Sequence, residues 1–413
     1  MDPGDDERVG RCMYTVFSVS ERSRVGRRIG VIVTAMAIAM TTVSAVIGST
    51  PADAAPGGVP GTVVSTEALP ARITVPGAVD AKRVTYWTKG VRDAAALSSG
   101  AVYLPPGTPP KGGWPVIAWA HGTTGLADHC AYSIGGPVAI ERDWEYLRSW
   151  MSQGYAVVAS DYVGLGTPGN HPYLNGRVEA HSIVDSVKAA RAVYPQLSRK
   201  WAVVGQSQGG GAAITTARYA TEFGGNELDY RGAVGTGVPA YIENLVAALG
   251  RPSPVPLGGF SPNTTIYVMY ILSGLRTSFP EWNINSFLTP YGRHWVDKAE
   301  TLCDSDDELG GLVRSQKVDP GKLLSRPLAE IPGFQATLTD YMGIPESGYD
   351  RPFFIGQGGL DTDVNTPGVL LLASRLKANN QPVTFRFYPN KDHSGTVNAS
   401  KVDSIPFIAK QFR

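Results

Sequence analysis

The sequence predicts an α/β fold, with a mostly parallel central sheet, helices on both faces of the sheet and a helical cap. Three observations predict this fold. Short apolar runs typical of buried strands alternate with helical patterns along most of the chain. One of these runs ends at a serine flanked by glycines, and a helix-forming stretch follows it. Between residues 239 and 346 the alternation stops, and helical patterns joined by prolines replace it.

The expected elements follow one another in the order that such a sheet requires. Two stretches of alternating polarity are expected to pair antiparallel at a sheet edge, and they are 83–87 and 100–104. The short runs expected as further strands are 115–120, 155–160, 201–204, 232–238, 352–356 and 382–388. The stretches expected as helices of the two covering layers are 141–151, 178–193, 212–219, 366–378 and 402–412.

One core interrupted by an insertion is the expected domain organisation. Residues 81–238 and 347–413 form the two parts of the core, and residues 239–346 form the cap. The helical patterns of the cap cover 241–249, 267–275 and 294–302. Residues 55–80 are rich in proline, glycine and alanine and are expected to lie extended over the surface. The alternative interpretation of 239–346 is a second, independent domain.

The first 54 residues are expected to be a leader rather than part of the fold. Four arginines precede an apolar run over 29–47, and the small-residue triplet Ala52-Asp53-Ala54 follows it. This order is typical of a secretory signal peptide and predicts export after cleavage near Ala54. The alternative is an uncleaved membrane anchor, because a run of this length could span a bilayer. Glycine, threonine and serine within the run favour cleavage.

Charge and cysteine usage narrow the function classes. The 413 residues carry a net charge of +1 and contain no basic stretch interleaved with aromatics, which argues against a nucleic-acid partner. Of the three cysteines, Cys12 falls in the leader. Cys130 and Cys303 are left as an even pair in an exported chain, so one disulfide is expected. The alternative is two buried thiols.

The stretch Gly205-Gln206-Ser207-Gln208-Gly209 has the G-x-S-x-G pattern of a nucleophile elbow, with an expected strand before it and an expected helix after it. A serine in so tight a turn needs a strained backbone, and β-carbons at the two glycine positions would collide with neighbouring backbone. We therefore expect the Ser207 hydroxyl to stand above the sheet edge as a nucleophile, with the backbone N–H of Gln208 facing the group that it attacks.

A serine nucleophile needs an imidazole to take its proton and a carboxylate to hold that imidazole. Asp361 and His393 each follow an expected strand, and the chain order Ser207, Asp361, His393 is that of the α/β-hydrolase fold. Asp363 lies two residues after Asp361 and is the competing acid. A helix expected from residue 366 offers Asp363 a structural role at its N-terminus instead.

The acyl-transfer intermediate also needs donors for its oxyanion. The backbone N–H of Gln208 is one expected donor, and Thr123 or Thr124, in the loop after 115–120, is the other. The alternative role for these threonines is that of simple turn residues. His121 in the same loop is expected to be structural, and no histidine cluster has metal-ligand spacing, so no catalytic metal is expected.

These motifs together resemble the secretory lipases, the family of the fungal lipase A type and of many actinobacterial exported lipases. The stretches that carry the resemblance are 120–125, 161–166, 171–173, 205–210, 361–364 and 392–396. The resemblance implies an α/β-hydrolase core with a cap after the nucleophile half, lipid ester substrates, no cofactor, and Ser207, Asp361 and His393 as triad. The acid in related hydrolases commonly opens a D-x-x-V pattern, which favours Asp361. Asn365 stands where the family commonly has proline.

The function predicted from the sequence is therefore that of an exported carboxylic-ester hydrolase, most simply a lipase, whose cap is the candidate contact with a lipid interface. A peptidase or acyltransferase with the same triad is the nearest alternative, because fold and triad fix acyl transfer but not the acyl acceptor. A catalytically silent surface-binding protein is the alternative from another class, and the intact triad positions disfavour it.

Overall fold

The computed structural model describes residues 58–253, 261–364 and 366–413. The predicted leader, its cleavage site near Ala54, the alternative anchor and residue 365 lie outside the described residues. Among the described helices, none is both long enough and apolar enough to cross a bilayer.

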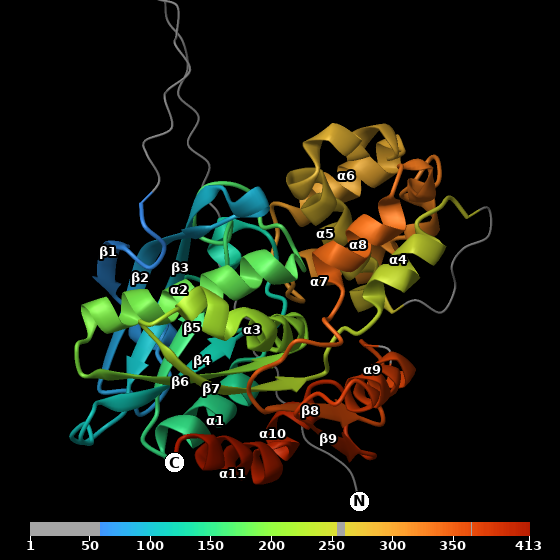
Figure 1. The fold of residues 1–413 in the computed structure, drawn as a ribbon. Helices are drawn as coiled ribbons and strands as arrows, with labels where there is room; N and C mark the ends of the chain where they lie inside the picture. The colour runs from blue at the N-terminus through green and yellow to red at the C-terminus, as the bar shows by residue number, and fades with distance from the viewer. Residues whose placement is uncertain (1–57, 254–260, 365) are drawn as a thin grey trace, which may run out of the picture. The chain divides into compact units, whose positions relative to one another are not determined.

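A nine-stranded sheet forms the centre of the described chain (Figure 1), and its strand order is β1-β2-β3-β5-β4-β6-β7-β8-β9. The strands are β1 (Val63–Ala68), β2 (Asp80–Lys89), β3 (Ala95–Leu104), β4 (Trp114–Ala120), β5 (Ala156–Ser160), β6 (Leu197–Gln206), β7 (Asp229–Thr236), β8 (Phe353–Gly358) and β9 (Val383–Tyr388). All neighbours from β5 through β9 are parallel, whereas β1, β2 and β3 pair antiparallel and β3 joins β5 antiparallel. The predicted mostly parallel sheet is confirmed.

The sheet extends further toward the N-terminus than the sequence pattern indicates. The stretches expected at its edge are β2 and β3, but β1 pairs with β2 and is the edge strand. Most of β1 is exposed on both faces, so it shows none of the alternation that predicts a half-buried strand. By contrast, β5 is buried throughout, as its continuous apolar sequence predicts.

Two layers of helices cover the two faces of the sheet. The helices outside the insertion are α1 (Ile140–Met151), α2 (Gly176–Val193), α3 (Gln208–Gly224), α9 (Thr366–Ala378), α10 (Gly395–Ala399) and α11 (Lys401–Gln411). Val187 of α2 and Leu372 of α9 share a buried cluster with Val203 of β6. Trp150 of α1 shares another cluster with Val204, the next residue of β6, because successive side chains of a strand point to opposite faces.

Between β7 and β8 the described chain is helical (Figure 1). This helical region contains α4 (Ile242–Leu249), α5 (Pro262–Ser278), α6 (Pro290–Ala299), α7 (Leu309–Gln316) and α8 (Phe334–Met342). Ser261 and Thr289 cap α5 and α6 by accepting backbone N–H groups, and each precedes a proline at the first helical position. Helices were expected at the places of α4, α5 and α6, whereas α7 and α8 were not expected.

The helical region packs on loops at the carboxyl ends of the strands. Its hydrophobic cluster includes Leu126 and Tyr173, which belong to loops of the core. The Tyr341 hydroxyl of α8 donates to the backbone carbonyl of Tyr173 at 2.8 Å. The contacts place this region beside the edge of the sheet where the predicted nucleophile lies. Seven short 3-10 helices complete the described chain: 71–73, 91–93, 128–130, 280–282, 284–286, 320–322 and 328–330.

Candidate active site

Ser207 lies in the tight turn between β6 and α3, as the elbow pattern predicts. Its backbone has φ 59° and ψ −125°, a conformation that is unfavourable for a residue with a β-carbon. A β-carbon on Gly205 would lie 2.0 Å from the carbonyl oxygen of Gly209, and one on Gly209 would lie 1.9 Å from that of Ala120. Both glycines are therefore required by close backbone contacts, and they hold the strained serine above the sheet.

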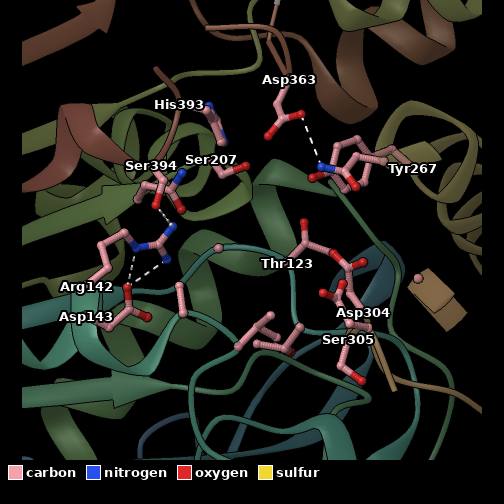
Figure 2. A pocket seen from close by; sticks show the side chains of 18 of the residues that line it. Thr123, Arg142, Asp143, Ser207, Tyr267, Asp304, Ser305, Asp363, His393 and Ser394 are labelled. Atoms are coloured by element: carbon pink, nitrogen blue, oxygen red, sulfur yellow. Dashed lines mark hydrogen bonds and ion pairs between the residues drawn. The ribbon is translucent and has the colours of Figure 1, made fainter. Parts of the chain in front are cut away.

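Asp361 and His393 meet in the loops that follow β8 and β9. His393 Nδ1 donates to Asp361 Oδ2 at 2.8 Å. The other ring nitrogen, Nε2, is buried and has no hydrogen-bond partner among the described residues. Ser207 and His393 line the same pocket, and Figure 2 shows their side chains next to each other there. The structure thus brings the three predicted triad residues together and leaves one imidazole nitrogen available to the serine.

The Asp361 carboxylate is held by donors on both oxygens. Oδ1 accepts the backbone N–H groups of Asp363 and Val364, each at 3.0 Å. Oδ2 accepts from Gln357 Nε2 at 3.1 Å in addition to His393. Burial would raise the pKa of Asp361, but the hydrogen bond and charge of His393 and the two backbone N–H groups outweigh it and lower the pKa. Asp361 is therefore ionised at neutral pH.

Asp363 lies in the wall of the pocket. Its side chain lines the pocket, and its Oδ1 accepts from Asn263 Nδ2 of α5 at 3.3 Å. The predicted role at the start of α9 would depend on contacts near residue 365, which lies outside the described residues. The contact with α5 gives Asp363 a place in the pocket wall, and the contact with His393 belongs to Asp361.

The three candidate donors to the oxyanion differ in their hydrogen-bond partners. Thr123 and Thr124 both line the pocket, and the Thr123 hydroxyl is paired with that of Tyr173 at 2.7 Å. The Thr124 hydroxyl is buried and has no partner among the described residues. Gln208 is the first residue of α3, so its backbone N–H is one of the unsatisfied donors at the helix N-terminus. All three therefore stay candidates for stabilising an oxyanion.

The Gln208 side chain is fixed by a buried network that no sequence motif predicts. Its Nε2 donates to His171 Nε2 at 2.8 Å and to Glu179 Oε1 at 2.7 Å. His171 Nδ1 donates to the carbonyl of Val163 at 2.8 Å, which leaves Nε2 as the acceptor. Burial lowers the pKa of His171 to about 4 and raises that of Glu179 to about 7. The sequence feature that indicates this network is Glu179, an acidic residue on the apolar face of the predicted helix 178–193.

His121 has the structural environment that the sequence predicts for it. The imidazole is buried, its Nδ1 donates to the carbonyl of Gly122 at 2.7 Å, and its ring stacks on that of Tyr132. Burial lowers its pKa, so the ring is neutral at neutral pH. It is not hydrogen-bonded to Ser207 or to Asp361 in the described structure.

Cys130 and Cys303 form a disulfide, as predicted, and it joins the loop after β4 to the helical region. His129 lies close to the two sulfur atoms, and one histidine with two free thiolates at this spacing could hold a metal ion. Both thiols are used by the disulfide, so they cannot supply the thiolates that such a site would need.

The pocket in front of Ser207 has a volume of about 230 Å³ and is mainly polar. Val138 and Ala139 are the only aliphatic residues among the described residues that line it. Figure 2 shows Arg142 and Asp143 on one side of Ser207 and Tyr267 and Asp304 on the other. These lining residues are not predicted by the sequence, because they come from helices and loops that only the folded chain brings together.

Comparison with solved structures shows the type of fold. Candida antarctica lipase A in its closed state is 19% identical, with a TM-score of 0.70 over 86% of this chain and 82% of that chain. A rice cell wall degrading esterase, LipA from Xanthomonas oryzae, is 20% identical, with a TM-score of 0.61 over 86% of this chain and 97% of that chain. These likenesses show that this chain has the α/β-hydrolase fold.

A family comparison is more specific. The family model described as Secretory lipase matches residues 136–310, which include the predicted nucleophile and much of the helical region. The resemblance seen in the sequence motifs is thereby confirmed over this segment. No curated protein sequence matches the chain. Fold and family match together support a hydrolase of the lipase and esterase class.

Proposed function

We propose that the protein is an exported serine hydrolase that cleaves carboxylic esters of lipids. One observation carries the proposal: Asp361 holds His393 by Nδ1 at 2.8 Å, while Nε2 stays unpaired in the pocket that contains Ser207. This arrangement fits acyl transfer through a serine nucleophile. The match to secretory lipases favours an ester as the acyl donor and export as the destination. The leader predicted in residues 1–54 is consistent with export.

In the first half of the reaction, Ser207 Oγ attacks the carbonyl carbon of the ester and gives its proton to His393 Nε2. The bond to the alcohol oxygen then breaks, and Nε2 returns the proton to that oxygen. Asp361 keeps Nδ1 protonated throughout, so Nε2 is always the nitrogen that exchanges protons with the reactants.

In the second half, water attacks the carbonyl carbon of the acyl-enzyme and gives one proton to His393 Nε2. The bond to Ser207 Oγ breaks, the serine regains its proton and the carboxylic acid leaves. Negative charge on the carbonyl oxygen develops in both halves. The backbone N–H of Gln208 is the proposed first donor to this oxygen, and Thr123 or Thr124 is the proposed second.

Hydrolysis of p-nitrophenyl butyrate by the purified exported protein tests the proposal. Ser207→Ala should lower kcat by about a millionfold, as loss of a triad serine does in subtilisin, while its far-UV spectrum stays that of the wild type. Ser305→Ala is the matched control, because Ser305 lines the same pocket and is not assigned a chemical role. A Ser207→Ala protein within tenfold of wild-type turnover would refute the mechanism.

Two alternatives predict other results in the same set of assays. A peptidase would hydrolyse peptide anilides faster than emulsified triglyceride or p-nitrophenyl esters. An acyltransferase would transfer the acyl group to an added alcohol faster than to water. A silent binding protein would hydrolyse none of them and would not react at Ser207 with a fluorophosphonate. Labelling of the wild type but not of Ser207→Ala is the expected outcome.

A further inference from the structure

The pocket in front of Ser207 contains more acidic than basic groups. Its two arginines are each occupied by a neighbouring carboxylate: Arg142 pairs with Asp143 at 2.7 Å, and Arg314 pairs with Asp306. Two further carboxylates, Asp304 and Asp363, line the same pocket. Each arginine–aspartate pair has no net charge, so Asp304 and Asp363 account for the negative charge of the described lining residues.

Neither Asp304 nor Asp363 forms an ion pair among the described residues, although the charge of Arg314 acts on Asp304 from a distance. Asp363 accepts one neutral hydrogen bond, from Asn263 Nδ2. The Asp304 carboxylate has no hydrogen bond or ion pair within the described ranges, although its backbone N–H donates to the carbonyl of Thr124 at 2.9 Å. The internal segments outside those ranges, 254–260 and 365, contain no lysine or arginine.

Two unpaired carboxylates in one pocket are electrostatically costly. Burial, followed by repulsion from Asp363, raises the pKa of Asp304 to about 7, with Arg314 opposing this effect and Asp306 adding to it. A cation bound between the two carboxylates would relieve the repulsion, whereas a neutral hydroxyl group would not. The pocket is therefore better matched to a positive charge than to a neutral polar group.

Other groups that line the pocket are also suited to a bound ligand. Tyr267 is half-buried in the same pocket, and its pKa is raised by burial first and then by the charges of Asp304 and Asp363. Aromatic rings attract quaternary ammonium groups through their faces. Thr124 Oγ1 and Gln206 Nε2 are buried polar atoms of lining residues and have no partner among the described residues. Figure 2 shows Asp363, Tyr267 and Asp304 around the same end of the pocket, across from Arg142.

We infer that this side of the pocket binds a cationic group of the substrate, so that the protein prefers esters whose alcohol part carries a quaternary or protonated amine. This inference rests on the proposed ester hydrolysis and names its substrate class. Asp304 and Asp363 neutralise the charge, and Tyr267 contacts the ammonium group. The ester carbonyl then lies at Ser207, a few bonds away from the ammonium nitrogen.

A matched pair of esters isolates the charge. Butyrylcholine and 3,3-dimethylbutyl butyrate have nearly the same shape, and they differ by the exchange of a charged nitrogen for a neutral carbon. We expect kcat/KM for the choline ester to exceed that for the carbon isostere by roughly tenfold or more, which corresponds to about 1.4 kcal/mol. A ratio of one or below in the wild-type protein would refute the inference.

Three variants connect this ratio to the two carboxylates. Asp304→Asn and Asp363→Asn should each lower the ratio by about threefold or more, and the double variant should bring it close to one. Asp307→Asn is the matched control, because Asp307 is exposed, lies three residues from Asp304 and does not line the pocket. It removes the same charge and should leave the ratio as it is. An equal fall in the control, or none in either pocket variant, would overturn the assignment.

Binding to a catalytically disabled protein separates this inference from the proposed function. With Ser207→Ala, titration calorimetry should show butyrylcholine bound more tightly than its carbon isostere. Adding Asp304→Asn should reduce the difference, and adding Asp304→Asn together with Asp363→Asn should remove it. If the wild type hydrolyses p-nitrophenyl butyrate but shows no preference for the cation in either assay, the inference is wrong and the proposed function stands. If the cation binds preferentially and no ester is hydrolysed, the proposed function is wrong and the cation site stands.

Discussion

Replacing Asp361 by asparagine should inactivate the protein through the protonation of His393. Oδ1 of Asp361 accepts two backbone N–H groups, from residues 363 and 364, so an asparagine must keep its oxygen there. Its NH₂ group would then occupy the Oδ2 position, 2.8 Å from His393 Nδ1. That group can only donate, so Nδ1 loses its proton and Nε2 carries it instead. The imidazole would then be unable to accept the proton of Ser207.

The magnitude follows from the chemistry of the triad. In chymotrypsin-type proteases the same change lowers kcat by about 10⁴ through the wrong tautomer, which corresponds to about 5 kcal/mol of activation free energy. A second cost falls on stability. The new NH₂ group would face Gln357 Nε2, which donates to Asp361 at 3.1 Å, and two donors would oppose each other in a part-buried site. We expect a loss of about 1–3 kcal/mol in the free energy of unfolding.

Steady-state hydrolysis of p-nitrophenyl butyrate measures the kinetic effect, and urea unfolding measures the effect on stability. Asp363→Asn is the comparison, because this neighbouring carboxylate contacts Asn263 rather than His393. Its kcat for this neutral ester should fall by less than about tenfold, since the tautomer of His393 is unaffected. If Asp361→Asn kept more than a tenth of wild-type turnover while Asp363→Asn lost the larger part, the assignment of the acid would have to be reversed.

Three further changes test other parts of the structure. Cys130→Ser with Cys303→Ser opens a loop of 173 residues and should lower the free energy of unfolding by about 5 kcal/mol, measured by urea titration of the oxidised and mutant proteins. Gly209→Ala should prevent correct folding, seen as loss of soluble protein, because its β-carbon would lie 1.9 Å from a carbonyl oxygen. Glu179 has a pKa raised to about 7, so the folded state binds a proton that the unfolded state releases above about pH 4. Its contribution to stability therefore falls as pH rises from about 4 to 7, by at most about 3 kcal/mol, and Glu179→Gln should flatten the pH dependence of the unfolding midpoint over this range.

The parts of the fold that the sequence predicts are those in which local pattern and final environment agree. β5 is apolar because both of its faces are buried, and the elbow around Ser207 has glycines because backbone atoms lie within 2.0 Å of their ideal β-carbon positions. β1 has no such agreement. It is held by hydrogen bonds to β2 while most of its side chains face solvent, so its sequence shows no strand period.

The site also contains residues that the sequence predicts and residues that it does not. Ser207, Asp361 and His393 follow strands in a fixed chain order, and the parallel sheet brings the ends of those strands to one edge. Asn263, Tyr267 and Asp304 come from the helical region, where neither a strand order nor a motif determines what faces the serine. Glu179 lies between these cases, because its position on an apolar helix face indicates a buried partner without naming Gln208.

The acidic side of the pocket is held in place by the contact between two distant segments, and this explains why it could not be predicted. Gly125 and Cys303 form an antiparallel bridge next to the disulfide, and the backbone N–H of Asp304 donates to Thr124 at 2.9 Å. Gly125 has φ 129°, and a β-carbon there would lie 2.7 Å from both the Cys130 sulfur and the Cys303 Cα. The loop with the proposed oxyanion donors and the segment with the unpaired carboxylate are thus joined by a disulfide, a bridge and a backbone hydrogen bond. The proposed selectivity for charge and the proposed stabilisation of the oxyanion therefore depend on the same rigid junction.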